Sequence, residues 1–280
     1  QELLRSAEPH IAGKLRALLL DARPTPLLAT GSGIGRYLIT GVLGRLGAGE
    51  MYAARDVEED RSVALKFLLM PATGESAGVD GCLAEVEAAA ALNHPNIVTV
   101  FELVRSAQAP AIAMELVAGQ VLREFCGTSL PLRRVLLIGE QIANALTAAH
   151  AAGIVHGGLS PDNIMVRTDG VVKVLDFGLA RYTGGSAANR QSHSAEGLRY
   201  LAPEDSAGQA APASDLFALG AMLYELAAGA HPFPAATPTA AMEAIRKSDP
   251  LALSRVNPHV PVEFSDLVGQ MLRKNPTERP

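Results

Sequence analysis

The chain has 280 residues, of which 48% are hydrophobic and 19% charged, and its formal net charge is −5 at pH 7. This composition is too apolar for a disordered chain and is sufficient for a large buried core. The acidic balance argues against nucleic acid or an anionic membrane as the main partner, because both select clustered positive charge.

The first 36 residues are expected to form a segment of their own. Leucine and isoleucine recur near helical spacing over 1–22, which predicts an amphipathic helix, and the prolines and glycines of 23–36 predict a linker. Two roles for this helix stay open. It packs against the rest of the chain, or it is a docking element for self-association.

A strand-rich stretch follows the linker. Apolar runs punctuated by glycine predict two or three strands over 37–69, and the runs 97–104 and 111–117 predict two more. Between them, 71–81 is a polar loop and 82–93 has the composition and spacing of a helix.

From Pro131 onward the pattern becomes helical. The predicted helices span 131–152, 214–229, 238–247 and 262–273, with short strands over 163–166 and 171–175 and a mobile loop over 182–196. Strands in the first part and helices in the remainder predict an α+β fold with two lobes.

Cysteine usage and hydropathy indicate the setting of the chain. The two cysteines, Cys82 and Cys126, form no C-x-x-C pair, so neither a disulfide framework nor a zinc site is expected, and a cytoplasmic location is the simpler interpretation. No apolar run has the length of a membrane-spanning helix, so no membrane segment is expected in these residues. Whether an anchor follows residue 280 stays open.

Several short motifs stand in order along the chain. VALK ends at Lys66, HPNI begins at His94, HGGLSPDN spans 156–163, DFG spans 176–178 and APE spans 202–204, with Asp215 and Arg279 completing the series. In this order and spacing they closely resemble the protein kinase family, in particular the bacterial Ser/Thr kinases.

The resemblance implies a bilobal protein-kinase-like fold over 37–280. A small, antiparallel β-rich N-lobe is expected over about 37–114, a hinge over 115–118 and a large α-helical C-lobe over 119–280. The last helix of the family is expected beyond Pro280. Glu204 and Arg279 are expected to form a buried ion pair, and Asp215 to cap backbone amides of the catalytic loop. A stack of His156, Phe177, Val100 and Ala89 is expected to join the lobes.

The resemblance also implies a site for ATP and magnesium. Lys66, paired with Glu85, is expected to hold the α- and β-phosphates, while Asn163 and Asp176 are expected to bind magnesium. Taken singly, each residue has an ordinary structural explanation. The other residues assigned to the nucleotide by the resemblance are Gly44 and Gly49 of the glycine-rich loop, Met51 and Ala64 above adenine, Met165 below it, the gatekeeper Met114, and the hinge residues Glu115 and Val117.

The catalytic loop departs from the family pattern, which reads HRDLKPxN or HGDLKPxN in active members. Gly158 replaces the aspartate that deprotonates the substrate, and Ser160 replaces the lysine that steadies the transferred phosphoryl group. Leu198 is assigned to the threonine of the GTPxYxAPE pattern, which is bonded to those two residues. No catalytic residue is therefore intact, and losing a positioned general base typically lowers the rate about 10²- to 10⁴-fold.

Three further positions bear on the site. Gly157 replaces the arginine that reads a phosphate on the activation loop, and Leu46 replaces the middle glycine of the glycine-rich loop. Asp162 is the one carboxylate that could substitute for the lost base, and it is expected to be an ordinary surface or turn residue instead.

The favoured interpretation is a pseudokinase that binds Mg-ATP and acts as a regulatory or scaffolding module toward an unidentified protein partner. Two alternatives stay open. One is an active Ser/Thr kinase, or another phosphoryl or nucleotidyl transferase, with a non-standard catalytic arrangement. The other is a scaffold whose cleft is filled by Leu46 and two methionines, so that it binds no nucleotide.

Overall fold

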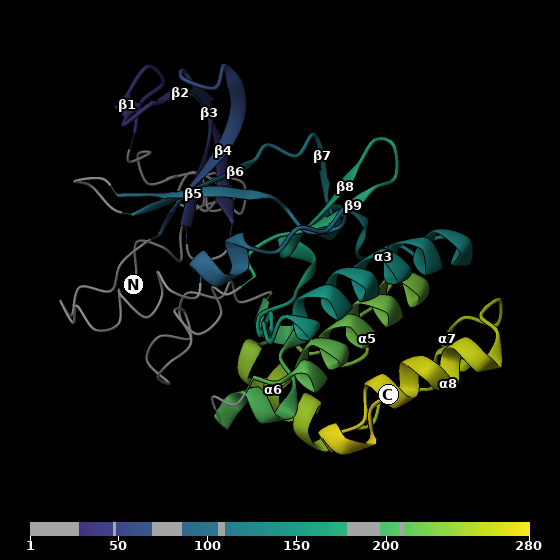
Figure 1. Cartoon of the computed structure of the whole chain (residues 1–280). Helices are drawn as coiled ribbons and strands as arrows, with labels where there is room; N and C mark the ends of the chain where they lie inside the picture. The colour runs from purple at the N-terminus through teal and green to yellow at the C-terminus, as the bar shows by residue number, and fades with distance from the viewer. Residues whose placement is uncertain (1–27, 47–48, 69–85, 106–109, 178–196, 208–209) are drawn as a thin grey trace, which may run out of the picture.

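The computed structural model describes residues 28–46, 49–68, 86–105, 110–177, 197–207 and 210–280. These residues form a sheet-rich lobe followed by a helical lobe, with the helices stacked on the side away from the large sheet (Figure 1). The predicted two-lobed α+β fold is confirmed. The predicted helix over 1–22 and the predicted loop over 182–196 lie outside the described residues.

The first lobe contains an antiparallel sheet of six strands. The strand order is β1-β2-β3-β4-β6-β5. The strands are β1 (Gly33–Ile34), β2 (Tyr37–Leu46), β3 (Gly49–Asp56), β4 (Arg61–Leu68), β5 (Val100–Val104) and β6 (Ala111–Glu115).

Strand β4 has hydrophobic residues on both faces, which explains its continuous apolar sequence. Val63, Leu65 and Phe67 belong to one core of the lobe, whereas Ala64 and Leu68 belong to a second apolar cluster on the other face. Because side chains alternate along a strand, Lys66 lies on the same face as Ala64.

Two sequence predictions were wrong in this lobe. The described part of the predicted linker packs on the sheet: Leu28 is buried, and β1 pairs with the start of β2. The predicted strand over 97–104 begins only at Val100. Before it, the Val98 amide donates to the Val174 carbonyl (2.9 Å) and the Val174 amide donates to the Asn96 carbonyl (2.8 Å), so the apolar start of this run packs against the second lobe.

A small antiparallel sheet begins the second lobe, with the order β7-β8-β9. Its strands are β7 (Gly119–Val121), β8 (Ile164–Arg167) and β9 (Val172–Val174). The two predicted short strands correspond to β8 and β9, and β7 was not predicted.

Helices make up the rest of the second lobe and confirm the helical pattern. The helices are α3 (Leu132–Ala151), α5 (Pro212–Ala228), α6 (Pro238–Lys247), α7 (Leu253–Val256) and α8 (Val262–Met271), with 3-10 turns η1 (Leu122–Phe125), η2 (Pro161–Asn163), η4 (Gly197–Tyr200), η5 (Pro203–Ala207) and η6 (Pro276–Glu278). Of the predicted helix over 82–93, the described residues 86–90 are helical. Helix α5 is buried along almost its whole length, because α3 and α8 both pack against it.

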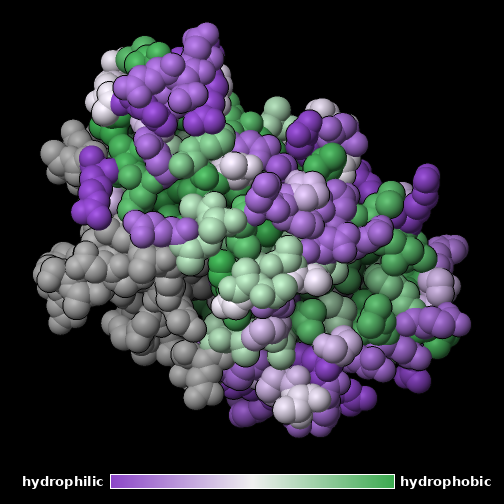
Figure 2. All heavy atoms as spheres, viewed as in Figure 1, coloured by the Kyte–Doolittle hydropathy of each residue, from purple (hydrophilic) through white to green (hydrophobic). Residues whose placement is uncertain are grey.

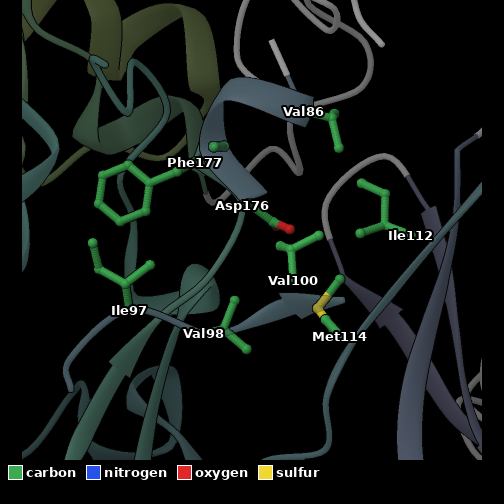
Figure 3. A pocket seen from close by; sticks show the side chains of 9 residues that line it. Val86, Ile97, Val98, Val100, Ile112, Met114, Asp176 and Phe177 are labelled. Atoms are coloured by element: carbon green, nitrogen blue, oxygen red, sulfur yellow. The ribbon is translucent and has the colours of Figure 1, made fainter. Parts of the chain in front are cut away.

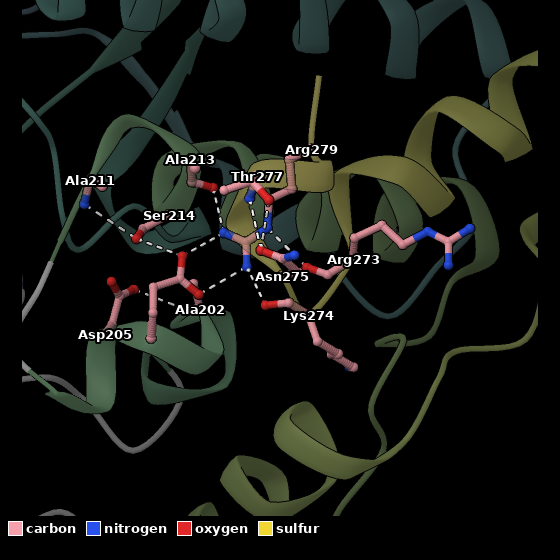
Figure 4. A network of polar contacts seen from close by, with 11 residues as sticks. Ala202, Asp205, Ala211, Ala213, Ser214, Arg273, Lys274, Asn275, Thr277 and Arg279 are labelled. Carbon is pink, nitrogen blue, oxygen red and sulfur yellow. Dashed lines mark hydrogen bonds and ion pairs between the residues drawn. The ribbon is translucent and has the colours of Figure 1, made fainter.

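The predicted structural contacts are present in this lobe. Asp215 accepts hydrogen bonds from the amides of His156 (2.9 Å) and Gly157 (2.8 Å), and the rings of His156 and Phe177 lie 4.9 Å apart. Arg279 pairs with Glu204 (Figure 4). The Asp215 bonds hold the loop before η2 against the helical core, and the Arg279 pair joins η5 to the end of the chain.

The surface is divided by polarity. Figure 2 shows hydrophilic residues at the tip of the first lobe and along the lower edge of the second, with hydrophobic residues reaching the surface between them. Among the described residues, no helix combines the length and the hydropathy that crossing a membrane requires.

Candidate active site

A buried lysine and a buried aspartate meet between the lobes. Lys66 on β4 places its Nζ 2.6 Å from Oδ2 of Asp176, and the two side chains are only 4% and 7% exposed. The predicted partner of Lys66, Glu85, lies outside the described residues, so that pair stays a prediction. The structure thus brings together two members of the implied site that are far apart in the sequence.

The second oxygen of Asp176 is available to a ligand. Its Oδ1 is buried and has no hydrogen-bond partner among the described residues. Asp176 also has a left-handed backbone, with a φ of 68°, a conformation that is uncommon for non-glycine residues and occurs in turns and at functional sites. An unpaired, buried carboxylate oxygen fits the oxygen ligands that magnesium prefers.

Asn163 lies beside the chain that leads to Asp176. Its Nδ2 donates to the Gly158 carbonyl (2.9 Å), and its own carbonyl accepts from the Leu175 amide (2.8 Å). The amide side chain is therefore oriented through its nitrogen, which leaves its oxygen for a cation.

Most of the predicted adenine-lining residues belong to one apolar cluster. Met51, Ala64 and Met114 are buried in it, and Val117 and Met165 pack against it. These residues come from both lobes, so the cluster has the placement that the resemblance implies.

The hinge begins at Glu115, whose carboxylate is held in place. Lys173 on β9 donates to it (2.8 Å), and the backbone amide of Glu115 donates to the Thr99 carbonyl (2.8 Å). The side chain is thus a structural contact between the lobes, while adenine recognition by the hinge backbone stays a prediction.

The hairpin of β2 and β3 contains the predicted glycine-rich loop. Gly44 has a φ of 124° and pairs with Met51 at an irregularity in the sheet, a conformation that favours glycine. Gly49 pairs with Leu46 at the end of the hairpin. The side chain of Leu46 lies outside the described part of the structure, so its effect on nucleotide stays a prediction.

A small cavity of about 20 Å³ lies behind Met114, next to Asp176 (Figure 3). It is large enough for one water molecule. Two members of the predicted stack, Ala89 and Val100, line it, and their small side chains leave this space beside Phe177. The remaining lining residues are Val86, Ile97, Val98 and Ile112.

The catalytic loop keeps its anchored backbone without a base at the expected position. Gly157 has a φ of 67°, whereas Gly158 is not one of the described glycines with a left-handed backbone. Ser160 is buried and makes no side-chain hydrogen bond to the described residues.

We expect Gly157→Ala to destabilise the domain by about 1–2 kcal/mol, because a Cβ is unfavourable in a left-handed conformation. Gly269→Ala is the opposite control: this residue lies in helix α8 with no atom near the added Cβ, and alanine is favoured there by about 0.5–1 kcal/mol. Urea unfolding measures both changes. A Gly157→Ala domain as stable as the parent would contradict the assigned conformation.

Asp162 lies in the η2 turn, in agreement with the expected surface or turn carboxylate, and it is also held by an arginine. Its two oxygens accept hydrogen bonds from Nε (3.1 Å) and Nη2 (2.8 Å) of Arg123, and both side chains are 25% exposed. This pairing commits both of its oxygens to a neighbouring turn, so the structure offers no substitute base at this residue.

The threonine position of the GTPxYxAPE pattern also needs correction. Tyr200 is fully buried and Glu204 is paired with Arg279, so the tyrosine and glutamate of the pattern are fixed. Counting between these two residues places the threonine at Gly197 and not at Leu198. Neither residue has a hydroxyl, so the loss itself stands.

Arg123 was missed by sequence reasoning, because no local pattern indicates it. Besides Asp162, its Nη1 donates to the Tyr200 hydroxyl (2.8 Å), which in turn donates to Glu225. Burial acts to lower the pKa of Arg123, but the bonds to Asp162 and Tyr200 outweigh it and raise that pKa. Burial and the Glu225 carboxylate raise the pKa of Tyr200.

Comparisons with known proteins agree with this geometry. The family model described as "Protein kinase domain" matches residues 37–280. The serine/threonine-protein kinase PrkC of Bacillus subtilis is 33% identical over 249 residues, which cover 88% of this chain and 38% of that protein. The serine/threonine-protein kinase PknB of Mycobacterium leprae is 33% identical over 252 residues, covering 87% of this chain and 40% of that protein.

A solved structure is similar over nearly the whole chain. The crystal structure of the Mycobacterium tuberculosis PknI kinase domain has a TM-score of 0.70 and 26% sequence identity, and the match covers 90% of this chain and 93% of that one. The curated relatives are longer, and the chain spans about two fifths of the length of those compared here.

Proposed function

Because the chain belongs to the protein kinase family, as a domain of the bacterial Ser/Thr type, we propose that it binds Mg-ATP between its lobes and does not transfer the phosphoryl group efficiently. In this proposal it is a pseudokinase that regulates or scaffolds a protein partner in the cytoplasm. The observation that carries the proposal is the buried Lys66–Asp176 pair beside a loop that has no base at Gly158.

The residues present fit the implied cofactor. Lys66 would hold the phosphates, and the free oxygens of Asp176 and Asn163 would bind magnesium. When bound, magnesium would neutralise the charge of the phosphates. The apolar cluster around Met51, Ala64 and Met114 excludes water from the adenine side of the site.

Two of the groups that phosphoryl transfer requires after nucleotide binding are missing. Gly158 has no group that takes a proton from a hydroxyl, and Ser160 is too short and uncharged to neutralise a phosphoryl group in transfer. Asp162 is held by Arg123. The retained residues therefore support binding, and a partner would read the lobe arrangement that nucleotide stabilises.

We expect Mg-ATP at about 100 times its dissociation constant to stabilise the domain by about 2.7 kcal/mol. For a chain of this size that raises the melting temperature by about 5–11 °C. Differential scanning fluorimetry with Mg-ATP measures the shift, and Asp176→Asn is the matched control because it removes the negative charge of the metal ligand. An unchanged melting temperature at millimolar Mg-ATP would favour the scaffold that binds no nucleotide.

Phosphotransfer itself separates the pseudokinase from the active alternative. Labelled Mg-ATP is incubated with the domain and with a generic protein substrate, beside the Asp176→Ala variant. We expect no incorporation above that of the variant. Incorporation that disappears in Asp176→Ala would make the domain an active kinase with a substitute base.

A further inference from the structure

We propose that Arg123 is a positioning residue for the metal-binding end of the catalytic loop, acting through Asp162 on Asn163. The inference rests on the proposed function, because Asn163 is a magnesium ligand only if the domain binds Mg-ATP. Arg123 lies in the η1 turn, which directly follows strand β7, and Asn163 is the last residue of the η2 turn.

The contact between the η1 and η2 turns consists of two hydrogen bonds with a defined orientation. The planar guanidinium of Arg123 gives two hydrogen bonds to the two oxygens of Asp162, 3.1 Å from Nε and 2.8 Å from Nη2. A bidentate pair of this kind fixes both distance and orientation, which a single contact does not. With both side chains 25% exposed, the pair is partly shielded from solvent.

Arg123 is itself held from the other side. Its Nη1 donates to the hydroxyl of Tyr200, a residue that is 1% exposed, and that hydroxyl donates to Glu225 of helix α5. The guanidinium also lies over the Tyr200 ring, 5.1 Å from its centre. Arg123 thus connects Asp162 to α5, the buried core helix of the second lobe.

Asp162 and Asn163 move together because they are consecutive in one 3-10 turn. That turn is closed by a hydrogen bond from the Asn163 amide to the Ser160 carbonyl (3.0 Å). Asn163 then receives the Leu175 amide on its carbonyl (2.8 Å), one residue before Asp176. Fixing Asp162 therefore fixes the spacing between the two predicted metal ligands.

This connection carries more weight here because the loop has few other side chains to hold it. Gly158 has none, and Ser160 makes no side-chain hydrogen bond to the described residues. Asp215 holds the start of the loop through the amides of His156 and Gly157. Arg123 performs the corresponding role at its end.

The test compares Arg123→Lys with Arg167→Lys. Lysine keeps the positive charge but cannot form the bidentate hydrogen bonds of arginine. Arg167 is the matched control, because it also bonds a nearby aspartate, Asp169 (2.8 Å), but the two side chains are 41% and 49% exposed and Arg167 stands at the far end of β8 from Asn163. Isothermal titration gives the affinity for ATP in EDTA and the affinity of the ATP-loaded domain for Mg²⁺.

We expect Arg123→Lys to lower the affinity for Mg²⁺ about 10- to 100-fold, the effect typical of residues that orient a metal ligand. The affinity for ATP in EDTA and both affinities of Arg167→Lys should stay within about twofold of the parent. Asp162→Asn, which keeps the shape of the side chain, should reproduce the loss. An unchanged Mg²⁺ affinity, or an equal loss of ATP affinity in EDTA, would overturn the positioning role.

Hydrogen exchange of the amides of 160 and 162–164 decides the question without nucleotide. Losing a charged hydrogen bond worth about 1.5–3 kcal/mol should speed their exchange about tenfold or more in Arg123→Lys, while strands β2 to β4 stay unchanged. Equal exchange in parent and variant would overturn the inference. If the parent binds no Mg-ATP, the proposed function fails, and the exchange result alone then decides whether Arg123 positions the loop.

Discussion

Arg279→Met is expected to destabilise the domain by about 3–5 kcal/mol, because it leaves the carboxylate of Glu204 partly buried without its partner. The Arg279 side chain is fully buried. It pairs with Glu204 and also donates to three backbone carbonyls, those of Ala213 (2.8 Å), Arg273 (2.9 Å) and Lys274 (3.2 Å), which gather η5, α5 and the end of the chain around one guanidinium (Figure 4).

Thermal unfolding measures this effect. A loss of this size should lower the melting temperature by about 6–20 °C. Arg167→Met is the control, since the exposed Arg167–Asp169 pair should contribute at most about 1 kcal/mol. A loss in Arg279→Met no greater than that of the control would contradict a structural role for the buried pair.

Burial would raise the pKa of Glu204, but Arg279 outweighs it and lowers that pKa.

The second large effect is a gain of activity. Gly158→Asp combined with Ser160→Lys is expected to raise phosphotransfer about 10²- to 10⁴-fold, because the pair restores a general base and a cation for the phosphoryl group. The anchors of the loop at Asp215 and Arg123 are already in place. Gly158 is not one of the described glycines with a left-handed backbone, so an aspartate is compatible with its conformation.

Labelled Mg-ATP and a generic protein substrate again provide the measurement. The same two substitutions in an Asp176→Ala background should give no gain, which separates restored chemistry from contamination. A domain that binds Mg-ATP and still shows the parental rate after both substitutions would contradict the view that these two positions limit catalysis.

Helices with local signals were predictable from the sequence. Helix α6 has the predicted bounds, since Thr237 accepts a hydrogen bond from the Ala240 amide just before its first turn and Pro238 suits that turn. The start of β5 was not predictable. The run from Ile97 is as apolar as a strand, but its first residues are buried against β9. Hydropathy reports burial and does not identify the surface that provides it.

The candidate site likewise contains contacts that the sequence could predict and contacts that it could not. The resemblance assigned Lys66 and Asp176 to one site, although it named Glu85 and not Asp176 as the partner of Lys66, and the structure brings the two together. The contact of Arg123 with Asp162 is outside any such pattern, and it joins two turns that are 39 residues apart. A side chain's partner across the fold leaves no periodicity in the sequence, so Asp162 was expected to be a surface or turn residue with no named partner.

The attachment of Val98 and Asn96 to β9 has a consequence for the motion of the lobes. The first lobe is tied to the second at this segment and again at the hinge, where Glu115 meets Lys173. A rigid body held at two points rotates only about the line that joins them. Once the Lys66–Asp176 pair separates, opening and closing of the nucleotide site are thus reduced to a single angular coordinate, while a torsional movement of one lobe over the other first requires one of these two attachments to break.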